Sequence, residues 1–231
     1  MTDRRIGAFS GFPPDAFRFY GELATEGNND RAWFDAHRDT YERCVRLPME
    51  ELLDLVADEF GTDGKVFRPN RDVRFSKDKR PYKEHCGAVI NHRNGTADPV
   101  FYVQVNGDGL FAASGQYELS RDQLDRVRRA IDDARVGGEL VGLVSQARAD
   151  GYSVEGSELK RAPRGYDPDH PRIELLRHKR LTVGRSWPIA PWMHTPEAGE
   201  RIMATWRAGL PIGRWLERHV GAAAEPIRRR A

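Results

Sequence analysis

Residues 68–85 read RPNRDVRFSKDKRPYKEH, and no other part of the 231-residue chain is as dense in charged side chains. The stretch holds seven basic and three acidic residues, a formal charge of +4, whereas the whole chain carries only +2. The rest of the chain is therefore slightly acidic, and the positive charge is concentrated here. Aromatic residues are interleaved with these charges, so we look here first for a functional site.

The stretch begins a region in which apolar and polar residues alternate with the period of a β-strand. In the sequence VFYVQVN at residues 100–106, the apolar residues at 101, 103 and 105 share one face. Such alternation is typical of an antiparallel sheet with one face against the core. The sequences ADP and NGDG supply turns between the later segments. We expect strands at residues 66–75, 85–91, 100–106 and 110–114.

Helical periodicity precedes and follows these strands. The second expected helix places Trp33, His37 and Tyr41 on one face, and we interpret His37 as a packing residue. The expected helices run from Pro14 to about Gly27, over about 30–46, over 48–60, onward from Ser120, and over 196–219.

We therefore predict one α+β domain over residues 13–220. It contains a mainly antiparallel sheet of about four to six strands, with helices packed on one face. Residues 1–12 are expected to be a flexible lead from which Phe9 and Phe12 dock on the core. Residues 221–231 are expected to be a mobile tail, because they have little to bury.

Composition excludes several classes of protein. No apolar run approaches the roughly 18 residues that a membrane span needs, and the N-terminus has no secretory pattern. Two cysteines make no disulfide framework, which favours a cytoplasmic protein with reduced thiols. A net charge near zero argues against a general nucleic-acid coat protein.

The parity of a strand at 66–75 would place Arg68, Asp72 and Arg74 on one face. The residues at 67, 73 and 75 would then share the other, apolar face. A carboxylate between two guanidiniums stays ionised and fixes both arginines, which makes a fork for phosphate or carboxylate. Pro69 indicates that this part of the strand is an edge or a bulge.

The following loop adds Lys77, Lys79 and Lys83, with Tyr82 and His85 as possible proton carriers. Three roles are consistent with Asp78: a turn residue, a salt-bridge partner or a general base. The same cluster is also explained as surface charge on a hairpin, tied together by structural ion pairs.

The motif Arg68-x-x-Arg71-Asp72-x-Arg74-Phe75-x-x-x-Asp78-Lys79-x-x-Tyr82 resembles the signature RxxRDxRFxxx[DN]KxxY of the bacterial family called domain of unknown function 2461. Further similarity includes the Asn28-Asn29 pair and the Lys160-Arg161-x-Pro163-x-Gly165-Tyr166 sequence, so the resemblance covers about residues 10–220. The family has no assigned activity, but a signature of charged residues implies a ligand site more than a core.

We predict two groups of site residues on this basis. Those expected to move protons are Asp72, Asp78, Tyr82 and His85. Those expected to bind the ligand are Arg68, Arg71, Arg74, Lys79, Lys83 and Arg161. Arg161 belongs to a second basic patch that either folds over the first as a lid or is a solvated loop.

Other site chemistries have weaker support. His85 and His92 are expected to point to opposite faces of a strand, and no CxxC or HExxH spacing occurs, so we predict no metal and no cofactor. Cys86 is expected to be a buried thiol, since its neighbour His85 faces away from it.

Three functions remain. The first is an enzyme or binder of a small phosphorylated or carboxylated ligand held in a closed basic pocket. The second is a nucleic-acid-binding module with an open basic surface, on which Tyr82, Tyr102 or Phe111 stacks against bases. The third is a structural or interaction domain in which every arginine of the motif is paired and buried. We expect no membrane partner, and the sequence determines neither the reaction nor the oligomeric state.

Overall fold

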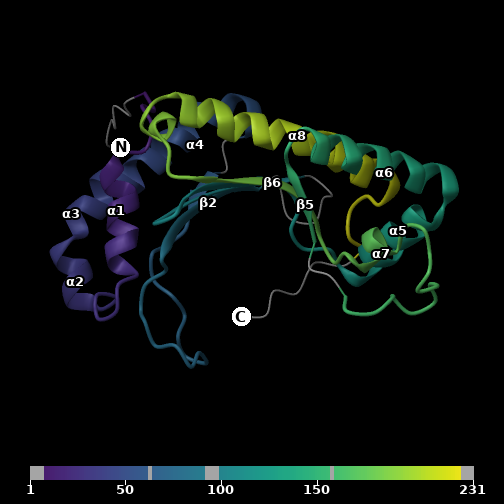
Figure 1. The fold of residues 1–231 in the computed structure, drawn as a ribbon, viewed down its shortest axis with the longest axis horizontal. Coiled ribbons are helices and arrows are strands. Elements are labelled where there is room, and N and C mark those ends of the chain that lie inside the picture. Colours follow the sequence, from purple (N-terminus) through teal and green to yellow (C-terminus); the bar gives the residue numbers. More distant parts are fainter. Residues whose placement is uncertain (1–7, 62–63, 92–98, 157–158, 225–231) are drawn as a thin grey trace. The chain divides into compact units, whose positions relative to one another are not determined.

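The computed structural model describes residues 8–61, 64–91, 99–156 and 159–224. The helices, α-helical unless noted, are α1 (Pro14–Leu23), α2 (Arg31–Ala36), α3 (Arg38–Thr40), the π-helix η1 (Tyr41–Arg46), α4 (Leu47–Phe60), α5 (Arg121–Asp132), α6 (Ala134–Ala149), α7 (Ile173–Arg177), the 3-10 helix η2 (Pro191–His194) and α8 (Glu197–His219). The strands are β1 (Gly64–Val66), β2 (His85–Asn91), β3 (Val100–Asn106), β4 (Gly109–Gln116), β5 (Ser153–Glu155) and β6 (Leu181–Pro188). Figure 1 shows these elements along the chain.

Among the described residues, the strands form one six-stranded antiparallel sheet in the order β1-β2-β3-β4-β6-β5. Gly64 lies opposite Ile90 in the first pair, and Ser153 lies opposite Gly184 in the last. The predicted α+β class, with an antiparallel sheet of four to six strands, is confirmed. None of the helices in the described ranges is long and apolar enough to span a bilayer.

The internal contacts of the chain divide it into two compact units. The first unit consists of residues 1–90, 102–112 and 186–203, and the second of residues 91–101, 113–185 and 204–231. Strands β3, β4 and β6 and helix α8 contribute residues to both. The domain boundaries predicted from the sequence stay a prediction.

The N-terminal lead is described only from residue 8. Phe9 and Phe12 are buried, as expected, and the Phe12 amide donates a hydrogen bond to the Met193 carbonyl at 2.8 Å. Residues 1–7, and residues 225–231 of the predicted mobile tail, lie outside the described part of the chain.

The core of the first unit is rich in aromatic rings. Phe19 lies at its centre, with ring centroids 5.2 Å from Tyr20, 5.4 Å from Trp33, and 5.8 Å from both Phe34 and Tyr41. Edge and tilted contacts of this kind stabilise the packing beyond the burial of area alone. They join α1 to the elements that follow it.

The predicted continuous helix over residues 30–46 is wrong. Helix α2 ends at Ala36, His37 leaves helical geometry with φ −107° and ψ 11°, and a π-helix follows from Tyr41. The His37 ring stacks on Trp33 at 3.9 Å, and its Nδ1 donates to the Trp33 carbonyl at 2.8 Å. His37 is therefore a packing residue, as expected, but it packs at a break in the helix.

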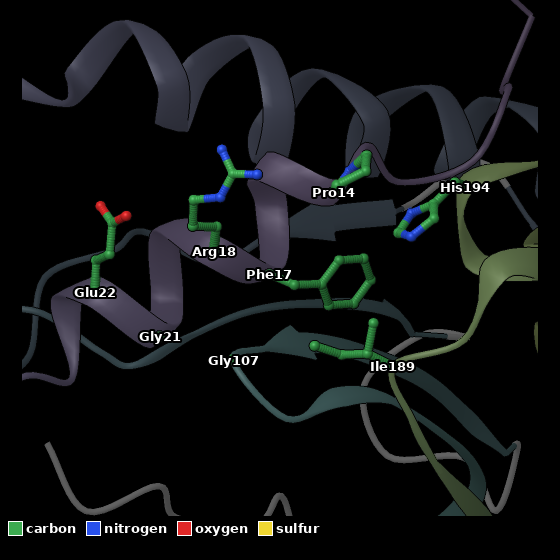
Figure 2. A pocket seen from close by; sticks show the side chains of 8 residues that line it. All are labelled: Pro14, Phe17, Arg18, Gly21, Glu22, Gly107, Ile189 and His194. Carbon is green, nitrogen blue, oxygen red and sulfur yellow. The ribbon is translucent and has the colours of Figure 1, made fainter.

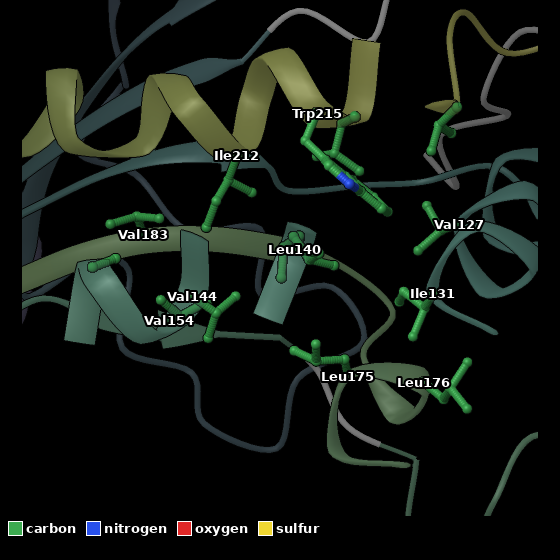
Figure 3. Packing of buried hydrophobic residues seen from close by; sticks show 14 residues of the cluster. Val127, Ile131, Leu140, Val144, Val154, Leu175, Leu176, Val183, Ile212 and Trp215 are labelled. Atoms are coloured by element: carbon green, nitrogen blue, oxygen red, sulfur yellow. The ribbon is translucent and has the colours of Figure 1, made fainter. Parts of the chain in front are cut away.

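The core of the second unit is aliphatic. Figure 3 shows Leu140 and Val144 of α6, Ile212 and Trp215 of α8, and Val183 of β6 meeting in one cluster. Ser120 begins α5 with a capping box, in which its hydroxyl accepts from the Gln123 amide, so the cap expected at Ser120 is confirmed.

The predicted strand over residues 66–75 is also wrong, because β1 ends at Val66. Val66 lies opposite Ala88, but the next paired residue, Asn70, lies opposite Tyr82. Between these two pairs the outgoing segment advances by four residues, from 66 to 70, whereas the returning segment covers six, from 82 to 88. The returning segment therefore carries a bulge. A break beside Pro69 is what its missing amide predicts.

Asn29 joins the connection between α1 and α2 to this irregular hairpin. Its Oδ1 accepts from the Tyr82 amide at 3.0 Å, and its Nδ2 donates to the Tyr82 carbonyl at 3.2 Å. Both residues are buried. The Tyr82 ring also stacks on Phe34, with centroids 3.9 Å apart and planes 10° apart.

We predict that Asn29→Ala lowers the free energy of unfolding by about 2 kcal/mol, because it leaves two buried backbone groups without partners. Urea denaturation measures the effect. The matched control is Asn28→Ala, which removes an exposed side-chain bond to the Glu22 carbonyl and should cost less than about 1 kcal/mol. Equal effects of the two substitutions would contradict the anchoring role of Asn29.

Candidate functional site

Residues 67–85, which we call the hairpin, run outward from β1 and return into β2. The Phe67 amide donates to the Gly87 carbonyl, the Lys83 amide to Pro69 and the Arg71 amide to Pro81, each at 2.8 Å. In Figure 1 the hairpin is the blue segment that runs off β2. It lies entirely within the first unit.

Asp72 forms a local ion pair at the tip of the hairpin. Arg74 donates to it twice, from Nε to Oδ1 at 3.0 Å and from Nη2 to Oδ2 at 2.7 Å. These hydrogen bonds lower the pKa of Asp72 to about 2. The carboxylate therefore fixes Arg74, as predicted, but it does not bind Arg68, the second arginine expected there; 72% of the Arg74 side chain stays exposed.

Asp78 holds two further arginines. Arg71 Nη1 lies 2.7 Å and Arg80 Nη2 lies 2.8 Å from Asp78 Oδ2, and Arg80 also contacts Glu84. Asp78 Oδ1 accepts from the Arg80 amide at 3.0 Å, which is a turn bond. Hydrogen bonds from Arg80 and then Arg71 hold the pKa of Asp78 far below its usual range. Asp78 is thus a turn residue and a salt-bridge partner.

Two cations, Arg68 and Lys83, and the imidazole of His85 are arranged differently at the base of the hairpin. Lys83 Nζ donates to the Arg68 carbonyl at 2.8 Å and lies 5.5 Å from the centre of the Phe67 ring. Burial and then the charge of Arg68 lower the pKa of Lys83. Burial and then the charge of Lys83 lower the pKa of His85. In the described part of the chain, no ion pair includes any of these three side chains, although the charge of Glu84 acts on His85 and that of Arg68 acts on Asp72.

An aromatic row lies on the face of the sheet next to these cations. Tyr102 of β3 has its ring 6.4 Å from Phe67 and 6.1 Å from Phe111 of β4. Its hydroxyl donates to Gln104 at 2.8 Å. Side chains on β3 alternate between buried and half-buried, so this row lies on the side away from the core. We call Phe67, Tyr102 and Phe111, with His85, the open face.

Gly87 keeps the open face accessible. A Cβ atom at this position would lie 2.7 Å from the Tyr102 hydroxyl and 3.2 Å from the Phe67 ring. Any other residue would therefore push the two rings apart or cover them. His85 precedes Gly87 by two positions and so points to the same side of β2, while Cys86 between them is buried.

The remaining predicted residues are placed less favourably. Tyr82 is only 6% exposed, so its ring is unavailable for stacking on a base. Lys79 Nζ donates to the Val73 carbonyl at 3.0 Å. Arg161 is exposed and belongs to the second unit, whereas the hairpin belongs to the first. The role of Arg161 stays a prediction.

Two aromatic residues were missed as functional candidates. The strand parity placed Phe67 and Phe75 on an apolar face, but the strand ends before them. Phe67 lies on the open face, and Phe75 is 95% exposed at the tip. The signal that could have identified them is Pro69, which interrupts the alternation on which the parity depended.

The described residues include neither a group of metal ligands nor a reactive thiol at the hairpin. Among the described residues, no group of three or more histidine, cysteine, aspartate or glutamate side chains could hold a metal ion. His92 lies outside the described residues. Burial raises the pKa of Cys86 to about 12, so its thiol is the inert buried one that we expected.

Two hollows in the described part of the chain have no residue of the hairpin in their linings. One, of about 370 Å³, is lined by α1 together with Gly107, Ile189 and His194. Figure 2 shows its apolar part, where Phe17 points toward Ile189 and His194. The other, of about 320 Å³, lies between α5, α6 and His219. Neither is the closed basic pocket expected around the motif.

Comparison with known proteins gives a family but no activity. A family model described as "Conserved hypothetical protein (DUF2461)" matches residues 15–215. No curated protein matches the chain. The matched range includes the hairpin and most of both units, but its description names neither a ligand nor a reaction.

We predict that Asp78→Asn loosens the hairpin without unfolding the first unit. A neutral amide cannot hold two guanidiniums, but the ion pairs are partly exposed and contribute little to global stability. Trypsin should therefore cut within residues 67–85 several times faster, while the melting temperature stays nearly constant. The control is Asp39→Asn, which removes an exposed helical pair with Arg43. Unchanged cleavage in Asp78→Asn would show that the pairs do not order the tip.

Proposed function

Because the chain belongs to the DUF2461 family of conserved hypothetical proteins, whose description names no reaction, we propose a function from the geometry. The open face binds a phosphorylated ligand that also carries a planar ring, as a nucleotide does. The ligand is either a free nucleotide or a nucleotide within a single strand. The single observation that carries this proposal is that Arg68 and Lys83, which form no ion pair among the described residues, lie beside an aromatic row.

The cations supply the phosphate-binding half of the site. Burial and then a neighbouring positive charge lower the pKa of Lys83 and that of His85: Arg68 acts on Lys83, and Lys83 acts on His85. Proteins usually place a carboxylate within such a group, as this chain does at Asp72 and Asp78. A phosphate bound at the base of the hairpin would provide the missing negative charge.

The aromatic row supplies the ring-binding half. Tyr102 and Phe111 were predicted as stacking residues, and both are half-buried on the open face with centroids 6.1 Å apart. Stacking of a base on an aromatic side chain contributes about 1–3 kcal/mol to binding. Lys83 lies over the Phe67 ring and so connects the two halves of the site.

The proposed activity is binding, not proton transfer. A carboxylate with a pKa near 2, such as Asp72, is a weak base at neutral pH. Asp78 is held ionised still more strongly, and Tyr82 is buried beneath Phe34. Arg71 and Arg74 keep the hairpin in shape, and their exposed donors remain able to contact a ligand.

Two alternatives, a closed pocket for a small carboxylate and a purely structural domain, fit the geometry less well. A closed pocket for a small carboxylate would not need an aromatic row outside it. A purely structural knot would bury its arginines, but the side chains of Arg74 and Arg80 are 72% and 50% exposed. The open surface therefore favours the nucleic-acid reading and the phosphorylated form of the small-ligand reading.

We predict that Lys83→Met raises the dissociation constant for a nucleoside monophosphate at least tenfold, about 1.4 kcal/mol. Isothermal titration calorimetry measures it. The control is Lys65→Met, which removes the same charge from exposed β1 of the same unit and should change the constant less than about twofold. The companion variant Tyr102→Leu should abolish the preference for a nucleoside monophosphate over ribose 5-phosphate. Absence of nucleotide binding by the unmodified protein, or equal effects of the two lysine variants, would refute the proposal.

We also predict that binding of a phosphodiester strengthens as the pH falls from about 8 to about 5.5. The pKa of His85 is lowered in the free protein, and a bound anion raises it again, so protonation and binding favour each other. A dinucleoside monophosphate is the right probe, since its phosphodiester does not titrate in this range. His85→Gln should remove the pH dependence. Binding that weakens toward low pH, or a dependence that survives His85→Gln, is the opposing result.

A further inference from the structure

Phe75 is the most exposed large apolar side chain of the described residues, with 95% of its surface accessible. It occupies the tip of the hairpin, among Arg74, Lys77 and Lys79, whose side chains are also exposed. A phenylalanine that packs against nothing contributes no burial to the fold. An exposed apolar ring of this kind is therefore better explained by a partner.

The backbone on either side of Phe75 is held in place. Before it, Asp72 binds the Arg74 side chain and also accepts from the Arg74 amide at 3.2 Å. After it, Lys79 reaches back to the Val73 carbonyl, and Asp78 holds Arg80. Exposed ion pairs add little to global stability, so their concentration here is best explained by the shape of the tip. A tip ordered in advance loses less entropy on binding.

The charges of the tip select the kind of partner. Asp72 and Asp78 are paired with guanidiniums, and the tip also presents the exposed cations Lys77 and Lys79 beside one exposed aromatic ring. Cations alternating with an exposed ring suit a ligand made of phosphates and flat bases. An acidic peptide offers the charge, but it does not offer the ring that Phe75 would stack on.

The length of chain between Phe67 and Phe75 limits how far apart the two rings lie. Phe75 follows Phe67 by eight residues, which span at most about 26 Å of extended chain. A strand of several nucleotides is long enough to contact both rings over such a span.

We infer that Phe75 is a second stacking site on the same path, so that the ligand is a single strand of nucleic acid that runs from the open face to the hairpin tip. This inference rests on the proposed function and specifies its substrate class. Phosphates between the two stacked bases would lie along the cations of the hairpin.

The test is a length series of thymidine oligonucleotides, from a dinucleotide to about twelve nucleotides, measured by fluorescence anisotropy. Affinity should rise with length until the strand spans both sites. Phe75→Ala should weaken binding of the longest strand at least fivefold and leave the dinucleotide unchanged. Phe75→Trp should restore binding. Tyr117→Ala, which removes another exposed ring, in the second unit, is the control and should have no effect.

The outcomes separate this inference from the proposal on which it rests. If Phe75→Ala changes every length equally or none, the tip is not a stacking site, but nucleotide binding through Lys83 and Tyr102 stands. If no length binds, both fail. If long strands need Phe75 but neither Lys83 nor Tyr102, the tip site stands and the open face is wrong. Preference for a glutamate-rich peptide over every oligonucleotide would replace the nucleic-acid strand with a protein partner.

Discussion

The side-chain amide of Asn29 is the constraint on which the arrangement of the first unit depends. It binds both the amide and the carbonyl of Tyr82, 53 residues further along the chain. A primary amide carries its donor and its acceptor on two separate atoms, so it can replace the strand partner that Tyr82 lacks on that edge. The bond fixes Tyr82 against Phe34 and thereby fixes where the hairpin leaves the helices.

The charged side chains of the hairpin are arranged differently at its tip and at its base. At the tip, two carboxylates each bind guanidiniums, and the cost of holding the cations close is offset within the protein. At the base, Arg68 and Lys83 form no ion pair among the described residues, and burial together with the charge of Arg68 lowers the pKa of Lys83. Ionisable groups with shifted pKa values of this kind are common at ligand-binding and catalytic sites. The tip is ordered by its own residues, whereas the proposed anion would balance the charges of Arg68 and Lys83 at the base.

The open face depends on the missing side chain of Gly87 as much as on the side chains that are present. Gly87 leaves room for the Tyr102 hydroxyl and the Phe67 ring, and any larger residue would occupy that space. The bulge before β2 turns the charged segment away from the ladder of the sheet, so that Lys83 lies over Phe67 and not in a regular strand. Backbone irregularity and a missing Cβ thus determine the surface on which the ligand is proposed to bind.

The sequence by itself determined the α+β class, most of the helices, the antiparallel sheet and the segment that carries the charge, because these follow from periodicity and composition along the chain. It also indicated that Asp72 holds Arg74, which lies two positions away, although Arg68 was expected there too. It left Asp78 open as a turn residue, a salt-bridge partner or a base. Only the tertiary structure decided that Tyr82 is buried, that Phe75 is exposed, and that Phe67, Tyr102 and Phe111 form one row. Those outcomes depend on partners tens of residues away and on a bulge that shifts the register by two. Local patterns carry no information about such distant contacts, whereas packing and hydrogen-bond satisfaction in the folded chain fix them.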